Sequence, residues 1–117
     1  MDQSLCKLTL VYPTAVADGL IEMILSSKRV IGGFTTFEAE GHGFDFSQAS
    51  AGERVRGRVA RGFLVAVMPR GHASLLLDDI RKTWPVLHMT YWLEPVLEIG
   101  RLVEGSALRA EQAGVSP

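Results

Sequence analysis

The stretch Glu38–Pro69, EAEGHGFDFSQASAGERVRGRVARGFLVAVMP, joins a polar, glycine-containing segment to a dense apolar run. Residues Gly62–Met68 are apolar at odd and even positions alike, which predicts a central β-strand covered on both faces. Pro69 ends this strand, because proline has no amide hydrogen for sheet pairing. The sequence on either side must supply the elements that cover it.

Two strands and a helix are expected before this run. Leu5–Tyr12 mixes alternation with β-branched residues and stops at a proline, which predicts a strand. Apolar residues at helical spacing predict an amphipathic helix over residues 14–28, with Thr14 placed to cap its first turn. Val30–Glu40 is rich in Thr, Phe, Val and Ile, and is expected to be the second strand.

After Pro69 the pattern repeats. An apolar stripe over residues 73–84 predicts a second helix, which Pro85 ends. Leu87–Leu93 alternates as a fourth strand, and PVLEIGRLV (95–103) is expected to extend it. The order βαββαβ predicts an α+β, ferredoxin-like sandwich, with two helices on one face of a four-stranded antiparallel sheet. Residues 1–105 are expected to form this single domain, and residues 106–117 a flexible tail.

Two features of this arrangement point to function. Hairpin connections are normally two to five residues long, yet residues 41–57 separate the second and third strands. We expect so long a connection to be a functional loop. The sheet face without helices also needs cover for its apolar side chains, and self-association of sheet against sheet is the simplest source.

Composition restricts the possible functions. The 117 residues suit one domain, and a net charge of −1 argues against general nucleic-acid binding. Cys6 is the single cysteine, so no intrachain disulfide can form. No apolar run approaches the ~20 residues that cross a bilayer, and the first residues do not resemble a secretory signal. A cytoplasmic protein without membrane insertion is expected.

His42 and Glu40 are candidate metal ligands at the start of the long loop. An imidazole and a carboxylate two residues apart could share a divalent ion, with His88 of a neighbouring subunit as a further ligand. The alternative is an exposed histidine whose flanking glycines, Gly41 and Gly43, serve the turn.

Arg54, Arg56 and Arg58 recur at every second position. In an extended segment their guanidinium groups point the same way, which suits an anionic ligand or an acidic partner surface. A solvated, charged loop explains the row equally well. On the fourth strand, Tyr91 and Trp92 should point to opposite faces, and Trp92 is predicted to lie in a subunit interface, with ligand stacking as the alternative.

No catalytic constellation is visible, and no enzyme activity is expected. No serine or cysteine nucleophile has a histidine at a recognisable spacing. Asp78 and Asp79 are adjacent on a predicted helix and therefore point in different directions.

The chain resembles the PII superfamily of trimeric, ferredoxin-like signalling proteins. EAEGHG (38–43) is similar to the G-x-G that opens the family's long loop, and RVARGFLVAVMPRGHASLLLDDI (58–80) has the layout of its third strand and second helix. YWLEPVLEIGRLVEG (91–105) resembles the family's segment after the fourth strand, with Pro95 and Arg101 at matching spacing. The resemblance implies a homotrimer with ligand sites at intersubunit clefts, involving Gly41, His42, Gly43 and Arg101.

The chain departs from the family where PII proteins hold ATP or ADP. Their phosphate-binding loop contains glycines and a lysine, whereas KTWPVLHM (82–89) contains no glycine, and Val103 replaces a second arginine. ATP or ADP binding by the PII mechanism is therefore not expected. A PII-like subfamily often encoded beside heavy-metal efflux pumps of the resistance-nodulation-division type is more similar, which implies a pump as partner. CutA metal-tolerance trimers share the architecture, so a metal-binding protein of that type is the alternative function.

Overall fold

The computed structural model describes residues 4–31, 33–42, 59–103 and 108–109. Its elements are β1 (Leu5–Pro13), a 3-10 turn (Thr14–Val16), α1 (Ala17–Ser27), β2 (Phe34–Gly41), β3 (Val59–Pro69), α3 (Arg70–Thr83), β4 (Thr90–Pro95), β5 (Glu98–Ile99) and β6 (Leu108–Arg109).

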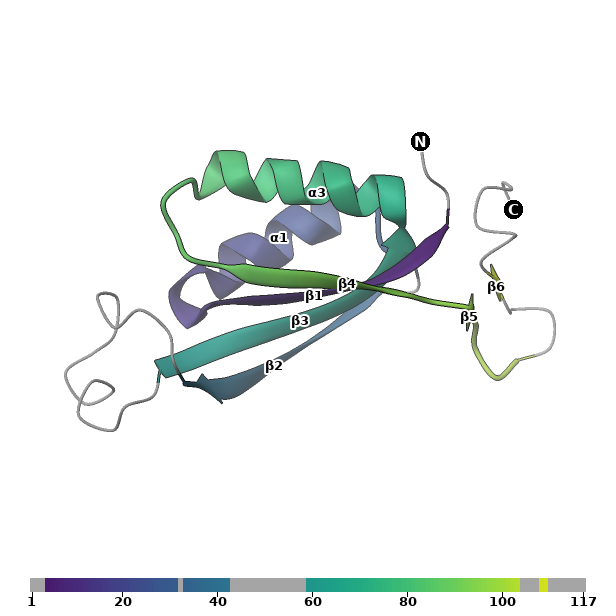
Figure 1. Ribbon diagram of the computed structural model, residues 1–117, viewed down its shortest axis with the longest axis horizontal. Helices are drawn as coiled ribbons and strands as arrows, with labels where there is room; N and C mark the ends of the chain where they lie inside the picture. The colour runs from purple at the N-terminus through teal and green to yellow at the C-terminus, as the bar shows by residue number, and fades with distance from the viewer. Residues whose placement is uncertain (1–3, 32, 43–58, 104–107, 110–117) are drawn as a thin grey trace.

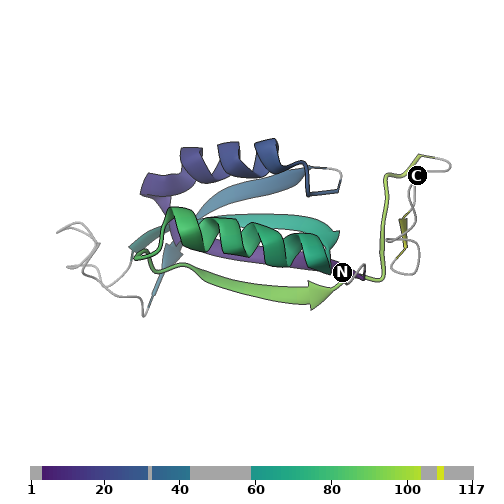
Figure 2. The same ribbon diagram turned by 90° about the horizontal axis from the view of Figure 1, so that it is seen from above.

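The main sheet has four strands in the order β2-β3-β1-β4, and every pairing is antiparallel. Both helices lie on the same face of this sheet, as Figures 1 and 2 show from two directions. The predicted α+β sandwich with the order βαββαβ is therefore confirmed.

The core lies between the helices and the sheet. Alternate residues of β1 and β3 point into it, and they pack against the apolar stripes of α1 and α3. The fully buried members include Leu8, Leu10, Leu64, Met68, Leu20, Ile24 and Leu76. The other alternate residues face away from the helices, on the surface that we call the open face.

Tyr12 and Gly62 form a close contact at one end of the core. The two residues are paired across β1 and β3, and the Tyr12 ring is only 2% exposed. A Cβ atom on Gly62 would come within 2.2 Å of this ring. Glycine is therefore needed at position 62 so that the tyrosine can lie flat across β3.

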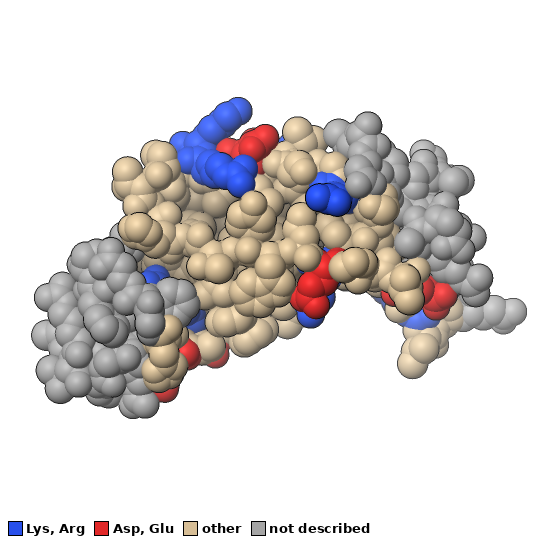
Figure 3. Space-filling model, viewed as in Figure 1, with Lys and Arg blue, Asp and Glu red and all other residues tan. Residues whose placement is uncertain are grey.

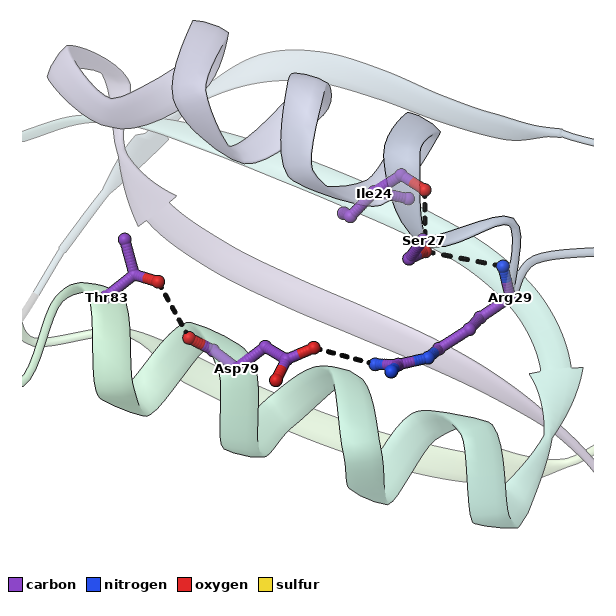
Figure 4. A network of polar contacts seen from close by, with 5 residues as sticks. All are labelled: Ile24, Ser27, Arg29, Asp79 and Thr83. Carbon is purple, nitrogen blue, oxygen red and sulfur yellow. Dashed lines mark hydrogen bonds and ion pairs between the residues drawn. The ribbon is translucent and has the colours of Figure 1, made fainter.

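The two helices are joined by a polar network near the end of α1 (Figure 4). Lys28 adopts a left-handed conformation, with φ of 54°, and ends the helix. Arg29 then donates from Nη1 to Oδ2 of Asp79 on α3 at 2.8 Å, and its backbone N–H donates to Oγ of Ser27 at 3.3 Å. The Arg29 carbonyl lies 3.2 Å from Nδ1 of His72, so the segment between α1 and β2 is held against α3.

Several local predictions were wrong, including the start of the fourth strand, since β4 begins at Thr90 rather than at Leu87. Thr14 makes no side-chain cap hydrogen bond and instead begins a 3-10 turn before α1. β2 begins at Phe34 rather than at Val30. The chain also does not extend β4 beyond Pro95: Val96 donates to the Leu5 carbonyl at 3.2 Å, and the chain then leaves the main sheet.

Beyond Val96 a second, two-stranded sheet forms between β5 and β6. In Figure 1 it projects from the end of the main sheet opposite the one where β2 finishes and β3 begins. Leu108–Arg109 of the predicted tail thus pair with β5, and the rest of that tail lies outside the described residues.

Candidate functional site

The start of the predicted loop lies at one end of the sheet. Gly41 is the last residue of β2, where it is buried and paired with Val59 of β3. Glu40, directly before Gly41, and His42, directly after it, are both exposed. The structure therefore places the imidazole and the carboxylate at the same sheet end, both open to solvent.

No group of three or more His, Cys, Asp or Glu side chains gathers anywhere in residues 4–31, 33–42, 59–103 and 108–109. A divalent ion held by His42 and Glu40 would need further ligands from elsewhere, such as another subunit. This pair stays a prediction. Gly43, Arg54, Arg56 and Arg58, the other loop residues predicted to bind a ligand, lie outside the described residues.

Arg101, the remaining predicted ligand residue, lies at the opposite end of the molecule. It is exposed and follows β5. Gly41 pairs with Val59 at one end of β3. Pro95, the last residue of β4 before the segment that contains Arg101, pairs with Cys6, and Cys6 pairs with Met68 near the other end of β3. From Val59 to Met68 at ~3.3 Å per residue, the two sheet ends are about 30 Å apart. In Figure 1, β5 and the end where β2 finishes and β3 begins lie at opposite ends of the main sheet.

The open face carries a contiguous aromatic cluster formed by Phe37, Phe63 and Trp92. The Phe37 and Phe63 rings stack with their centroids 5.2 Å apart, and Trp92 meets Phe63 edge-on at 6.5 Å. Phe37 is 49% exposed and Trp92 is 41% exposed. Large aromatic rings this exposed and this close together are typical of a surface that another protein covers.

Charged groups border this aromatic cluster on one side. The Trp92 indole donates from Nε1 to Oε1 of Glu94 at 3.1 Å, and Nζ of Lys7 lies 3.6 Å from the same oxygen. Tyr91 has the opposite orientation, with the Arg81 guanidinium of α3 lying 5.8 Å from its ring centroid. The prediction that Tyr91 and Trp92 point to opposite faces is confirmed.

Sequence reasoning missed Phe37, Phe63 and Arg61. Alternation along β3 assigns Phe63 to the open face, and strand pairing then places Phe37 opposite it. Arg61, two residues earlier on β3, is only 3% exposed. A buried arginine whose backbone pairs with Pro13 and Ala39 cannot be recognised before the strand register is known.

The acidic pair on α3 is structural. Asp78 accepts a hydrogen bond from Arg81 of the same helix at 2.9 Å, whereas Asp79 accepts from Arg29. The prediction that these carboxylates do not face each other is confirmed. On the surface shown in Figure 3, basic and acidic side chains gather together over α3. None of the helices in the described part of the chain combines the length and apolar character needed to span a membrane.

The fold is that of the PII-like proteins. PII from Arabidopsis thaliana bound to citrate superposes with a TM-score of 0.68 at 16% identity, covering 96% of this chain and 94% of that one. CPII, a nitrogen regulatory PII-like protein from Thiomonas intermedia K12 bound to ADP, AMP and bicarbonate, gives 0.62 at 16% identity, covering 85% and 96%.

Within this fold class, the chain belongs to DUF3240, a protein family of unknown function whose profile matches residues 1–103. A DUF3240 family protein from Shewanella baltica OS155 has a similar structure, with a TM-score of 0.69 at 15% identity, covering 86% of this chain and 98% of that one. No curated protein matches the chain by sequence. At these identities the structural likeness establishes the fold alone.

Proposed function

We propose that this chain is a PII-like regulatory protein that binds a small anion at clefts between copies of itself. The observation that supports this most directly is the separation of its candidate ligand residues. Gly41 and His42 lie at one end of the sheet, and Arg101 follows the strand that ends at the other, about 30 Å away at ~3.3 Å per residue. A small ligand can touch both groups only where one subunit meets another.

The aromatic cluster on the open face supports the same assembly. Phe37, Phe63 and Trp92 provide the apolar centre of an interface, and the neighbouring Lys7–Glu94 pair provides a polar border. A homotrimer in which three sheets meet by their open faces would cover this cluster in every copy. It would also bring the two ends of different subunits together around the ring.

Arg101 is the residue that we expect to bind the anion, because a guanidinium group binds an oxyanion through two parallel hydrogen bonds. The ligand would act as a switch by binding more tightly to one arrangement of the segment after His42 than to the others. That segment would then present a different surface to a partner protein. The family resemblance suggests a heavy-metal efflux pump as this partner.

Subunit mixing tests the shared site directly. The first step is to find which of bicarbonate, phosphate or citrate raises the melting temperature of the wild-type protein. Arg101→Ala and His42→Ala should each abolish that increase. When the two variants are unfolded together and refolded as a 1:1 mixture, a site formed between neighbouring subunits should recover in about one quarter of the clefts.

The other outcomes of this experiment are equally informative. If the mixture binds no better than either variant, the two residues do not form a site between subunits, and the proposal is wrong. If Zn²⁺ or Cu²⁺ rather than an anion stabilises the protein, and His42→Ala abolishes the effect, the protein is instead a metal-binding one of the CutA type. A strong stabilisation by ATP would contradict the expectation drawn from the glycine-free connection between α3 and β4.

A further inference from the structure

A small, solvent-open pocket lies on the helix-covered side of the sheet, away from Arg101, and Phe37 of the aromatic cluster is one of its lining residues. Its volume is about 230 Å³, and it lies between the start of α1 and the paired strands β2 and β3. Ala17 and Ile21 form its apolar side, and Tyr12, Thr14, Thr36 and Glu38 provide its polar groups.

Four polar residues line this pocket, and three of them, Thr14, Thr36 and Glu38, are exposed to solvent. Tyr12, Gly62 and Glu38 are paired in register across three strands. A Cβ atom built on Gly62 would lie 2.8 Å from the Tyr12 hydroxyl, so this hydroxyl is held above β3 on the way from β1 to β2. Three hydroxyl-bearing residues and one carboxylate-bearing residue therefore border the same small space.

The electrostatic character of the cavity is negative. Glu38 is the only ionisable carboxylate in its lining, and no Lys, Arg or His lines it among the described residues. Burial of the phenol, and secondarily the charge of Glu38, raise the pKa of Tyr12 above its ordinary value. The tyrosine hydroxyl therefore stays protonated at neutral pH, and it remains available as a neutral hydrogen-bonding group beside the carboxylate.

We infer that this cavity binds a small primary ammonium group, such as the amino group of a small metabolite. A primary ammonium carries three N–H donors and one positive charge, which match the hydroxyl oxygens and the single carboxylate. The apolar side formed by Ala17 and Ile21 accommodates a short alkyl substituent. One carboxylate without a second acid or a histidine does not form a divalent metal site.

Titration with methylammonium chloride, followed by two-dimensional NMR of the ¹⁵N-labelled full chain, tests this inference. The amide signals of Thr36, Glu38 and Gly62 should shift in a saturable way, whereas signals from β4 should not. Glu38→Gln keeps the shape of the side chain but removes its charge, and it should weaken binding about tenfold or more. Glu40→Gln is the matched control, because Glu40 lies on the same strand but outside the cavity lining, and it should bind as the wild type does.

Two salts provide further controls at the same ionic strength. Tetramethylammonium has the same charge but no N–H donors, so it should cause no saturable shift, and potassium should compete only weakly. The inference is overturned if no saturable shift occurs, if Glu38→Gln binds like the wild type, or if either salt matches methylammonium. Arg101→Ala should bind methylammonium normally, so a failure of the intersubunit anion site would leave this result unaffected.

Discussion

At the scale of single residues, the contact between Tyr12 and Gly62 shapes one end of the molecule. The absence of a side chain at Gly62 lets the tyrosine ring lie across β3. The buried ring then closes the core beneath α1, and its hydroxyl helps to line the cavity. A single glycine thus determines both the packing of the core and the shape of a candidate binding site.

Gly62→Ala should therefore destabilise the protein. The added methyl group would lie 2.2 Å from the Tyr12 ring, and displacing a buried ring typically costs about 1–3 kcal/mol of unfolding free energy. Urea denaturation monitored by circular dichroism measures this change. Gly19→Ala is a suitable comparison, because its nearest neighbour is a Trp84 side-chain atom at 3.2 Å and alanine raises helix propensity by about 1 kcal/mol. Equal losses in the two variants would contradict the proposed role of Gly62.

At the scale of elements, α1 and α3 are linked by a few polar contacts outside the apolar core. Arg29, just beyond α1, pairs with Asp79 of α3, and the two side chains are 27% and 45% exposed. Asp78, the adjacent residue, pairs with Arg81 of its own helix, and both of these side chains are well exposed. The first pair connects two elements that are far apart in the sequence, whereas the second supports only one turn of helix.

The two aspartates should respond differently to the same substitution. Asp79→Asn should lower the unfolding free energy by about 1 kcal/mol, because it weakens a partly buried, charge-assisted contact. Asp78→Asn should lower it by about 0.3 kcal/mol, the typical contribution of an exposed pair within a helix. Parallel thermal denaturation at low and high salt measures both changes. A loss for Asp78→Asn as large as that for Asp79→Asn would show that the connection between the helices contributes little.

The order of these elements and the faces that they bury could be predicted from the sequence. Burial of one face makes apolar residues recur at a fixed spacing, which differs between helices and strands. Gly62–Met68 indicated a central strand and the apolar stripes indicated two helices on one face. The predicted cover on the second face of this strand is not supplied by the chain itself, because Phe63, Val65 and Val67 are partly exposed there. The ends of the elements were less predictable. Lys28 and Gly33 both have positive φ angles, of 54° and 92° respectively, and β2 begins only after them, at Phe34. The aromatic cluster depends on the pairing of β2 with β3, which periodicity within one strand does not reveal.

At the scale of the whole molecule, the two faces of the sheet have different roles. One face is covered by the helices of the same chain, whereas the other exposes Phe37 and Trp92. From the residues alone the candidate site could be predicted only as separate side chains, and it was the resemblance to PII proteins that assigned Gly41 and Arg101 to clefts between subunits. The residue pattern does not show that the two lie at opposite ends of the sheet. The strand register shows that a site using both Gly41 and Arg101 would need a second subunit.

Trp92→Ala should dissociate the proposed trimer, because the indole lies in the exposed aromatic cluster. Truncation of an aromatic residue at the centre of an interface typically costs about 2 kcal/mol or more of binding free energy. Light scattering coupled to size-exclusion chromatography should then show a smaller mass at micromolar concentration. Tyr91→Ala is the matched control: Tyr91 is similarly exposed at 44% but faces α3, and the variant should keep the wild-type mass. A monomeric wild-type protein would contradict the proposed assembly.

The pairing of Gly41 with Val59 also affects how this family can diversify. These two residues are already adjacent across the sheet where the chain departs and returns, and the entropy of closing a longer connection rises only slowly with its length. Evolution can therefore lengthen, shorten or recompose the intervening segment without rebuilding the framework that carries it. Related chains could keep one architecture while exchanging the part that we propose contacts a partner, and a protein engineer could do the same by grafting between these two positions.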